Sequence, residues 1–246
     1  MGSTWEIGGL ARSFKHCTLA SALNSHSRAG PFIMLNILGK RPEWKFFAVL
    51  PRADAGLAPG EVATWSDQGT AANDLAQDSA LQQPTVVLDG TSRMPVVALD
   101  GVDDTLLFGS RLGSIRTVFW VIRRSPSMTP GYRMLLGDSV NYDFLGDTTT
   151  KLWSTSASVS VRNGVTRLNG EVVNGTATDR PGGLSVLSLV TTGSVKADAF
   201  SRDRTYNRSW WGDLAELVIY DRALSDAEVR SVEEYLAARY GIELAP

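Results

Sequence analysis

Near its C-terminus the chain reads Trp211-Gly-Asp-Leu-Ala-Glu-Leu-Val-Ile-Tyr-Asp-Arg-Ala-Leu224, and Ser225-Asp-Ala-Glu228 follows directly. Side chains alternate through residues 212–220 with the period of two that places successive strand residues on opposite faces. The two predicted faces are Ala215, Leu217 and Ile219 on one side, and Leu214, Glu216, Val218 and Tyr220 on the other. We therefore expect a strand here, followed at once by a helix.

The signals for this helix begin at Ser225 and Glu228. Their Ser-x-x-Glu spacing is that of a capping box, in which each side chain bonds the other residue's backbone amide. Arg239 supplies a cation in the last turn, and Gly241 can adopt the left-handed conformation that ends many helices. These signals predict a helix over 226–240 that packs on the outside of the β structure. Its apolar stripe consists of Val229, Val232, Leu236 and Tyr240, the first three against the sheet.

From Trp44 onward, short apolar or alternating runs are separated by Gly, Asp, Asn and Pro, which is typical of a sandwich or barrel. The run 116–122 is apolar on both faces, as expected of a central strand. Asn-Gly pairs in 162–165 and 168–171 predict two-residue hairpins, because Asn-Gly readily adopts positive φ angles. The predicted strands are 44–49, 62–65, 85–88, 96–99, 104–108, 116–122, 132–136, 151–154, 159–162, 165–168, 171–173, 184–190 and 212–220. We predict an all-β fold of two antiparallel sheets lying face to face.

The first 43 residues differ from the remainder of the 246-residue chain. They hold His16, His26 and the single cysteine, Cys17, and they show no clear alternation. Three such residues are too few for a structural zinc site, and one cysteine excludes an internal disulfide. We predict an N-terminal appendage of unknown role at 1–43 and one β domain at 44–246.

Charge and hydropathy argue against two classes of partner. The net charge is −2, with Lys and Arg scattered along the chain, which is not the basic patch of a nucleic-acid-binding protein. No run approaches the ~20 apolar residues of a membrane span. The N-terminus lacks a basic segment leading into an apolar core, so no secretory signal is evident. We predict neither a nucleic-acid nor a membrane partner.

Several short motifs follow one another in an order and spacing that match those of a known domain family. The front half contains Arg52-Ala-Asp-Ala-Gly56, Thr64-Trp-Ser-Asp-Gln-Gly69, Asn73-Asp-Leu-Ala-Gln77, Pro84 and Val96-Val-Ala-Leu-Asp-Gly-Val-Asp-Asp104. The back half contains the run 211–228 and a helix ending Tyr240-Gly-Ile242. Together, residues 46–243 resemble a laminin-G-like (LamG) domain of the concanavalin A-like lectin/glucanase superfamily. The chain departs from the pattern at Pro51, where such domains have an apolar strand running directly into the Ala-Asp-Ala-Gly turn.

The resemblance implies a jelly-roll sandwich and an extracellular, cell-surface or virion-associated location. It does not imply one activity, because this superfamily holds lectins, adhesion modules, glycanases and lyases. Our leading hypothesis is a carbohydrate-binding module of lectin type with a glycan as its partner. The alternatives are a polysaccharide-cleaving enzyme, either glycoside hydrolase or lyase, and a structural or adhesion module without sugar affinity.

Candidate sugar-binding residues lie in the loop before the last strand and in the segment 138–153. Aromatic rings stack on sugar C–H faces, while amides and guanidinium groups bond the hydroxyls. The candidates are Arg202, Arg204, Tyr206, Asn207, Trp210, Tyr142 and Trp153. Trp210 and Trp211 point opposite ways on a strand, so only one can be core. We assign Trp211 to the core and leave Trp210 open between core and binding. The Asp- and Asn-rich segment 138–147 also fits a pair of turns.

The run Asp100-Gly-Val-Asp-Asp104 gathers three carboxylates, Asp100, Asp103 and Asp104. Calcium prefers oxygen ligands, and the resemblance includes calcium-binding relatives, so these residues could hold calcium. A calcium shell needs six to eight oxygens, however, and the run alone does not supply them. The other interpretation is a tight loop between two strands. No other cofactor is predicted.

Catalytic residues are weakly indicated. Histidine is absent after position 26, so the β domain has no Ser-His-Asp triad. The Glu-x-Asp-x-x-Glu-like run of the glucanase branch is also absent. The weak candidates are Asp143 and Asp147, which could pair only if their loop folds suitably, and Glu216 on the last strand.

Overall fold

The computed structural model describes the backbone of β1 at 46–49 and, with side chains, residues 60–69, 71–204 and 208–246. The chain divides into two compact units, Met1–Lys40 and Arg41–Pro246, and every described residue belongs to the second. The predicted appendage at 1–43 and the motif at 52–56 lie outside the described residues.

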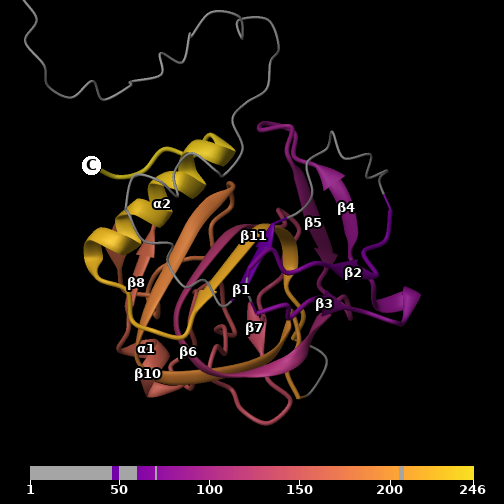
Figure 1. Cartoon of the computed structure of the whole chain (residues 1–246), viewed down its shortest axis with the longest axis horizontal. Coiled ribbons are helices and arrows are strands. Elements are labelled where there is room, and N and C mark those ends of the chain that lie inside the picture. The colour runs from indigo at the N-terminus through magenta and orange to yellow at the C-terminus, as the bar shows by residue number, and fades with distance from the viewer. Residues whose placement is uncertain (1–45, 50–59, 70, 205–207) are drawn as a thin grey trace, which may run out of the picture. The chain divides into compact units, whose positions relative to one another are not determined.

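Antiparallel strands make up most of the regular structure, and one long helix lies near the C-terminus (Figure 1), which confirms the all-β prediction. The strands are β1 (Phe46–Val49), β2 (Thr64–Trp65), β3 (Leu75–Ala76), β4 (Thr85–Leu88), β5 (Pro95–Asp100), β6 (Leu106–Arg124), β7 (Leu136–Gly137), β8 (Val165–Leu168), β9 (Glu171–Val173), β10 (Ser185–Phe200) and β11 (Trp211–Tyr220). The helices are the one-turn α1 (Val159–Arg162) and α2 (Asp226–Tyr240), and Ala80–Gln82 form a 3-10 turn. None of the helices among the described residues is long and apolar enough to cross a membrane.

Backbone pairing links these eleven strands into one sheet. Its main path runs β4-β5-β11-β6-β10-β8-β9, while β3 pairs with β6 and β7 pairs with β10. One edge of β11 is shared, because β5 pairs with residues 211–214 and β1 pairs with residues 216–219. The strand β11 therefore lies inside the sheet, with β6 along one edge and β5 and then β1 along the other.

The two longest strands, β6 and β10, run side by side along a common curve (Figure 1). Their pairing is regular between 117–122 and 185–190, and it shifts register at three points between Val190 and Ala199. Register shifts of this kind bend a ribbon and increase its local twist. The bend carries the far ends of β6 and β10 to β3 and β7, and it leaves residues 109–114 at the surface.

The main core lies on the inner side of this curve and is rich in aromatic rings. Trp120 pairs with Leu187 of β10 and with Leu217 of β11, and its ring contacts those of Phe144 and Trp153. Residues 118–122 are all 0% exposed, which confirms 116–122 as a central strand buried on both faces. The largest fully buried side chains include Trp65, Trp120, Trp153, Trp210, Phe144 and Phe200.

The helix α2 covers the opposite face of the sheet, as its sequence predicts. Ser225 Oγ accepts from the Glu228 amide, and the Glu228 carboxylate accepts from the Ser225 amide, so the capping box is complete. Gly241 ends the helix in the left-handed conformation with φ 67°. A second core forms beneath α2 from Val229, Val232, Leu236, Phe119, Val121, Val218 and Tyr220.

One of the two predicted hairpins is confirmed. Asn169 and Gly170 have φ angles of 50° and 82°, and they join β8 to β9. The hairpin predicted at 162–165 is wrong, because residues 159–162 form α1 instead of a strand. Ser158 caps α1 by accepting from the Val161 amide, a local bond that competes with strand pairing.

Two further predicted strands are mostly loop. Within 132–136, Met134 makes an isolated bridge to Leu145, and only Leu136 enters a strand, β7. Within 151–154, only Lys151 forms a bridge, to Asp179. The apolar residues of these segments pack in the core without pairing in a sheet. Leu152 and Trp153, for example, are both buried.

The predicted faces of β11 are wrong for two residues. Leu214 pairs with Ile122 and Glu216 pairs with Val121, so Ala215 is an extra residue in β11 and forms a bulge. The bulge places Ala215 under α2 and Leu214 in the main core, the reverse of a strict alternation. Both cores are apolar, so the sequence pattern carries no sign of the bulge.

Candidate functional site

Two loops that lie far apart in the sequence meet at one surface. Tyr142 belongs to the loop after β7, and Arg204 belongs to the loop between β10 and β11. The guanidinium carbon of Arg204 lies 3.7 Å from the centroid of the Tyr142 ring, and the same group donates to Tyr142 Oη. Both residues were sequence candidates, and the fold brings them together across 62 positions.

A second arginine extends this contact. The guanidinium carbon of Arg208 lies 4.5 Å from the Tyr132 ring and 5.5 Å from the Tyr142 ring. Its Nη1 donates to the buried Asp203 carboxylate at 2.8 Å, which holds the guanidinium in place. A cation that lies over an aromatic ring is attracted electrostatically to the face of that ring. These contacts therefore hold the two loops together. We name Tyr132, Tyr142, Arg204 and Arg208 the tyrosine–arginine surface.

The loop that carries Tyr142 is shaped by Asp138. Both oxygens of this carboxylate accept from Arg111, at 2.7 and 2.8 Å, and one also accepts from the amides of Val140 and Asn141. Burial alone would raise the pKa of Asp138, but the bonds from Arg111 and the amides hold it below its usual value. Asp138 is therefore ionised and holds the loop in shape. Both of its oxygens are already bonded, so neither is free to bind a ligand.

The other loop leaves β10 close to β7. A Cβ at Gly137 would lie 1.1 Å from the carbonyl oxygen of Arg202, so only glycine permits this approach. Ser201 fixes the loop at both ends, because its hydroxyl donates to Asp104 O and accepts from the Trp210 amide. Arg202 is half-buried at this point. The remaining candidates of the loop, Tyr206 and Asn207, lie outside the described residues.

Asp143 is the one catalytic candidate that lies beside Tyr142. Its Oδ2 accepts from the Lys196 amide at 2.8 Å, and its side chain is half-buried. Burial raises the pKa of Asp143, and the nearby carboxylate of Asp138 adds to the rise. Lys196 and Arg111 oppose this effect without cancelling it.

The other two catalytic candidates have structural partners. Glu216 is 0% exposed and lies beneath α2, where its Oε2 accepts from Tyr240 Oη at 2.9 Å. Asp147 Oδ1 accepts from the Thr149 amide and hydroxyl, which makes it a turn residue. Asp143 and Asp147 have different partners, and neither acts on the charge of the other.

The assignment of the adjacent tryptophans is corrected. Trp210 is 1% exposed and belongs to the main core, whereas Trp211 is half-exposed. The Trp211 side chain lies against Gly101, and the Arg133 guanidinium lies 5.8 Å from its ring centroid. Trp153 is also core, at 1% exposed, with its Nε1 donating to Thr166 Oγ1. Neither Trp210 nor Trp153 can stack on a ligand at the surface.

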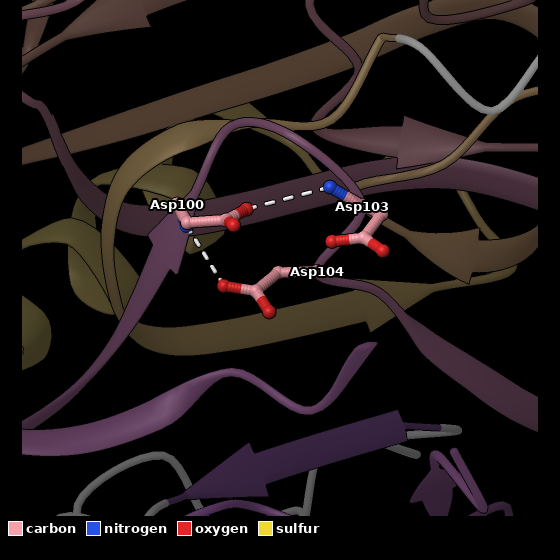
Figure 2. Close-up of side chains that lie close together, drawn as sticks. All are labelled: Asp100, Asp103 and Asp104. Carbon is pink, nitrogen blue, oxygen red and sulfur yellow. Dashed lines mark hydrogen bonds between the residues drawn. The ribbon is translucent and has the colours of Figure 1, made fainter. Parts of the chain in front are cut away.

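The three carboxylates of Asp100, Asp103 and Asp104 converge, as Figure 2 shows, with one ligand oxygen of each within 4.8 Å of the others. Asp100 Oδ1 accepts from the amides of Val102 and Asp103, and Asp104 Oδ2 accepts from the Asp100 amide. Burial, together with the two neighbouring carboxylates, raises the pKa of Asp104 to about 6. These bonds confirm the tight loop between β5 and β6, and Figure 2 shows the Asp100 and Asp104 carboxylates directed at backbone amides of the same loop.

Comparison with known proteins adds no relative, since no protein family, curated protein or solved structure matches the chain. The site therefore rests on the geometry of its own residues. Sequence reasoning missed Tyr132 and Arg208. Arg208 lies within the cationic run 202–208 and could have been included, whereas nothing in the sequence around Tyr132 points to a surface role.

Proposed function

We propose that the protein binds carbohydrate at the tyrosine–arginine surface and that its curved antiparallel sheet is a jelly-roll sandwich of the laminin-G-like kind. The observation that carries the proposal is the convergence of Tyr142 and Arg204 from two separate loops. Loops at one end of a rigid β scaffold are common places for recognition. The resemblance of residues 46–243 to a superfamily rich in lectins supports the same class of ligand.

The chemistry of the surface fits a sugar. Tyrosine offers an apolar ring and a hydroxyl, and Tyr132 and Tyr142 are both only half-buried. The guanidinium groups of Arg204 and Arg208 present N–H donors that can bond ring hydroxyls. Asp138 and Asp203 hold the two loops before any ligand arrives, which lowers the entropy lost on binding.

Binding is better supported than cleavage. A glycosidase of either type needs two carboxyl groups that flank the scissile bond. Burial raises the pKa of Asp143, but its neighbour Asp138 has both oxygens engaged with Arg111. Release of reducing ends or of unsaturated sugars from a polysaccharide panel, lost in Asp143→Asn, would favour the enzyme instead.

The first prediction concerns Tyr142. In a glycan array and in titration calorimetry with the glycans it selects, Tyr142→Ala should weaken binding by about 1–3 kcal/mol, because the ring supplies stacking area and holds Arg204. The matched control is Tyr235→Ala, which removes a tyrosine that contacts an arginine, Arg239, on α2. Equal affinity in the Tyr142 variant and the wild type would contradict the assignment of the site, and no binding to any glycan would contradict the function.

We also propose that Asp100, Asp103 and Asp104 hold calcium. One oxygen of each carboxylate lies within 4.8 Å of the other two, so a single ion could contact all three at the 2.3–2.6 Å typical of calcium. The backbone carbonyls of Gly101 and Asp104 are already bonded to Arg133 and Ser201. Water would have to complete the shell, which is typical of a weak site.

The second prediction follows from this weak site. Calcium at about 10 mM should stabilise the protein by about 1–3 kcal/mol if its dissociation constant is 0.1–1 mM. Thermal unfolding should show this shift at pH 7.5 and a smaller one at pH 5, because the raised pKa of Asp104, about 6, lets protons compete there. Asp104→Asn should abolish the shift. A response equal to that of magnesium at the same ionic strength would contradict a calcium site.

A further inference from the structure

The sequence contains three Asn-Gly pairs, at 163–164, 169–170 and 174–175, and the structure describes all of them. An asparagine followed by glycine can react within the chain, because glycine has no side chain to keep its backbone nitrogen away from the asparagine side-chain carbon. In that reaction the nitrogen displaces ammonia from the side-chain amide and closes a succinimide ring. The hydrogen bonds that each pair already makes therefore decide how readily it reacts.

Two of the three pairs are held by such bonds. The Gly164 amide donates to the Val161 carbonyl at 3.1 Å, so its nitrogen already has a partner. Asn169 is held by its side chain, whose Oδ1 accepts from the Val186 amide at 2.8 Å and whose Nδ2 donates to Ser185 Oγ at 3.4 Å. These bonds have to break before the ring can close, which slows the reaction at both positions.

The reacting groups of the third pair, Asn174-Gly175, have no such partners. Asn174 is exposed in the turn that follows β9. Its Nδ2, the group that would leave as ammonia, has no hydrogen-bond partner among the described residues. The backbone nitrogen of Gly175 likewise donates to no atom in the part of the chain that the structure describes. Both the attacking and the leaving nitrogen are therefore available.

The side-chain oxygen of Asn174, by contrast, is bonded twice to one residue. Asn174 Oδ1 accepts from the Thr176 amide at 3.1 Å and from Thr176 Oγ1 at 2.8 Å. The first bond closes a ring of atoms that includes the Gly175 nitrogen, so the side chain folds back toward that nitrogen. Negative charge develops on Oδ1 when the nitrogen adds to Cγ, and donors already fixed at such an oxygen lower the barrier to the addition.

We propose that Asn174 is a site of spontaneous deamidation and reacts before Asn163 and Asn169. The Gly175 nitrogen gives up its proton to hydroxide and forms a bond to Asn174 Cγ. The Cγ–Nδ2 bond then breaks, and Nδ2 takes a proton from water and leaves as ammonia. Water opens the succinimide at one of its two carbonyl carbons and produces aspartate or isoaspartate. The reaction does not depend on carbohydrate binding at the tyrosine–arginine surface.

Isoaspartate would disturb the turn, because it adds a carbon atom to the backbone there. The Asn174 carbonyl accepts from the Ala177 and Thr178 amides at 2.9 and 2.8 Å, and these bonds close the turn. The turn is attached to the main core, since the Trp153 amide donates to the Gly175 carbonyl at 3.0 Å. A Cβ on Gly175 would lie only 2.2 Å from Trp153 Cδ1. Conversion to isoaspartate should therefore lower the stability of the domain.

The test incubates the purified whole chain at mildly alkaline pH and follows each pair by peptide mapping and mass spectrometry. Asn174 should deamidate about tenfold faster than Asn163 or Asn169, the equivalent of one hydrogen bond that need not break. Thr176→Val should slow the reaction at Asn174 about three- to tenfold, because it removes one donor to Oδ1. Thr178→Val is the matched control, since the Thr178 hydroxyl makes no hydrogen bond among the described residues.

Thermal unfolding of the aged samples provides a second readout. A transition of lower Tm should grow in step with the isoaspartate content, and Asn174→Gln should prevent it, because the longer side chain closes its ring more slowly. Faster reaction at Asn163 or Asn169 would overturn the proposal. Equal rates at Asn174 in the wild type and Thr176→Val would do the same. Since no sugar is present, either result leaves carbohydrate binding to be judged on its own.

Discussion

Trp210→Ala should lower the free energy of unfolding by about 3–5 kcal/mol and leave glycan affinity unchanged. The side chain is 1% exposed in the main core, so its removal leaves a large cavity there. The backbone amide of Trp210 also bonds Ser201 Oγ, but that bond survives the substitution. Chemical denaturation measures the loss, and calorimetry with a selected glycan measures the affinity.

The matched control for this experiment is Trp211→Ala at the next position. Trp211 is half-exposed and packs on Gly101, so we expect a loss of stability of about 1 kcal/mol. If Trp210→Ala left stability almost unchanged and abolished glycan binding, Trp210 would be a ligand contact and the described core would be wrong at this point.

The second large effect is a fall in stability with rising pH that originates at Glu216. Burial raises the pKa of Glu216 from 4.5 to about 7, although Arg239 and Tyr240 partly oppose the rise. The carboxylate is 0% exposed, and its Oε1 has no hydrogen-bond partner among the described residues. The folded protein therefore holds a proton that the unfolded chain releases above pH 4.5. The stabilising effect of that proton is complete below pH 4.5 and is lost as the pH rises through 7, a change of about 3 kcal/mol.

Glu216→Gln tests this assignment, because glutamine keeps the shape and stays neutral. The difference in unfolding free energy between the variant and the wild type should move by about 3 kcal/mol in favour of the variant from pH 4.5 to 8. Glu234→Gln, at an exposed position of α2, should follow the wild type at every pH. Denaturant titrations across this range provide the data. A difference that does not vary with pH would show that Glu216 does not titrate as described.

The features that sequence reasoning predicted correctly are those whose causes are local. The capping box of Ser225 and Glu228 and the left-handed Gly241 act within a few residues, and α2 has the predicted bounds, 226–240. Asn169-Gly170 forms its hairpin for the same reason. A central strand, 116–122, is also legible, because burial on both faces requires an unbroken apolar run.

The errors arise where local patterns are ambiguous. At 162–165 a second Asn-Gly pair ends α1 and does not join two strands, because Ser158 caps a helical turn. The bulge at Ala215 changes which of the two cores the residues on either side of it face. Both cores are apolar, so the hydrophobic pattern of the sequence does not reveal the bulge. Trp210 and Trp211 point to opposite sides, and only the tertiary structure shows that Trp210 enters the main core while Trp211 lies against Gly101 of another loop.

The sequence by itself determined the all-β class, the C-terminal helix and the residue types available for binding, since each depends on periodicity, capping or composition within a short window. Only the tertiary structure decided which candidates meet. Arg204 reaches Tyr142 because β7 pairs with the end of β10 and the close contact at Gly137 brings the two loops together. Such contacts depend on register and packing across the whole sheet, and no short stretch of sequence encodes them.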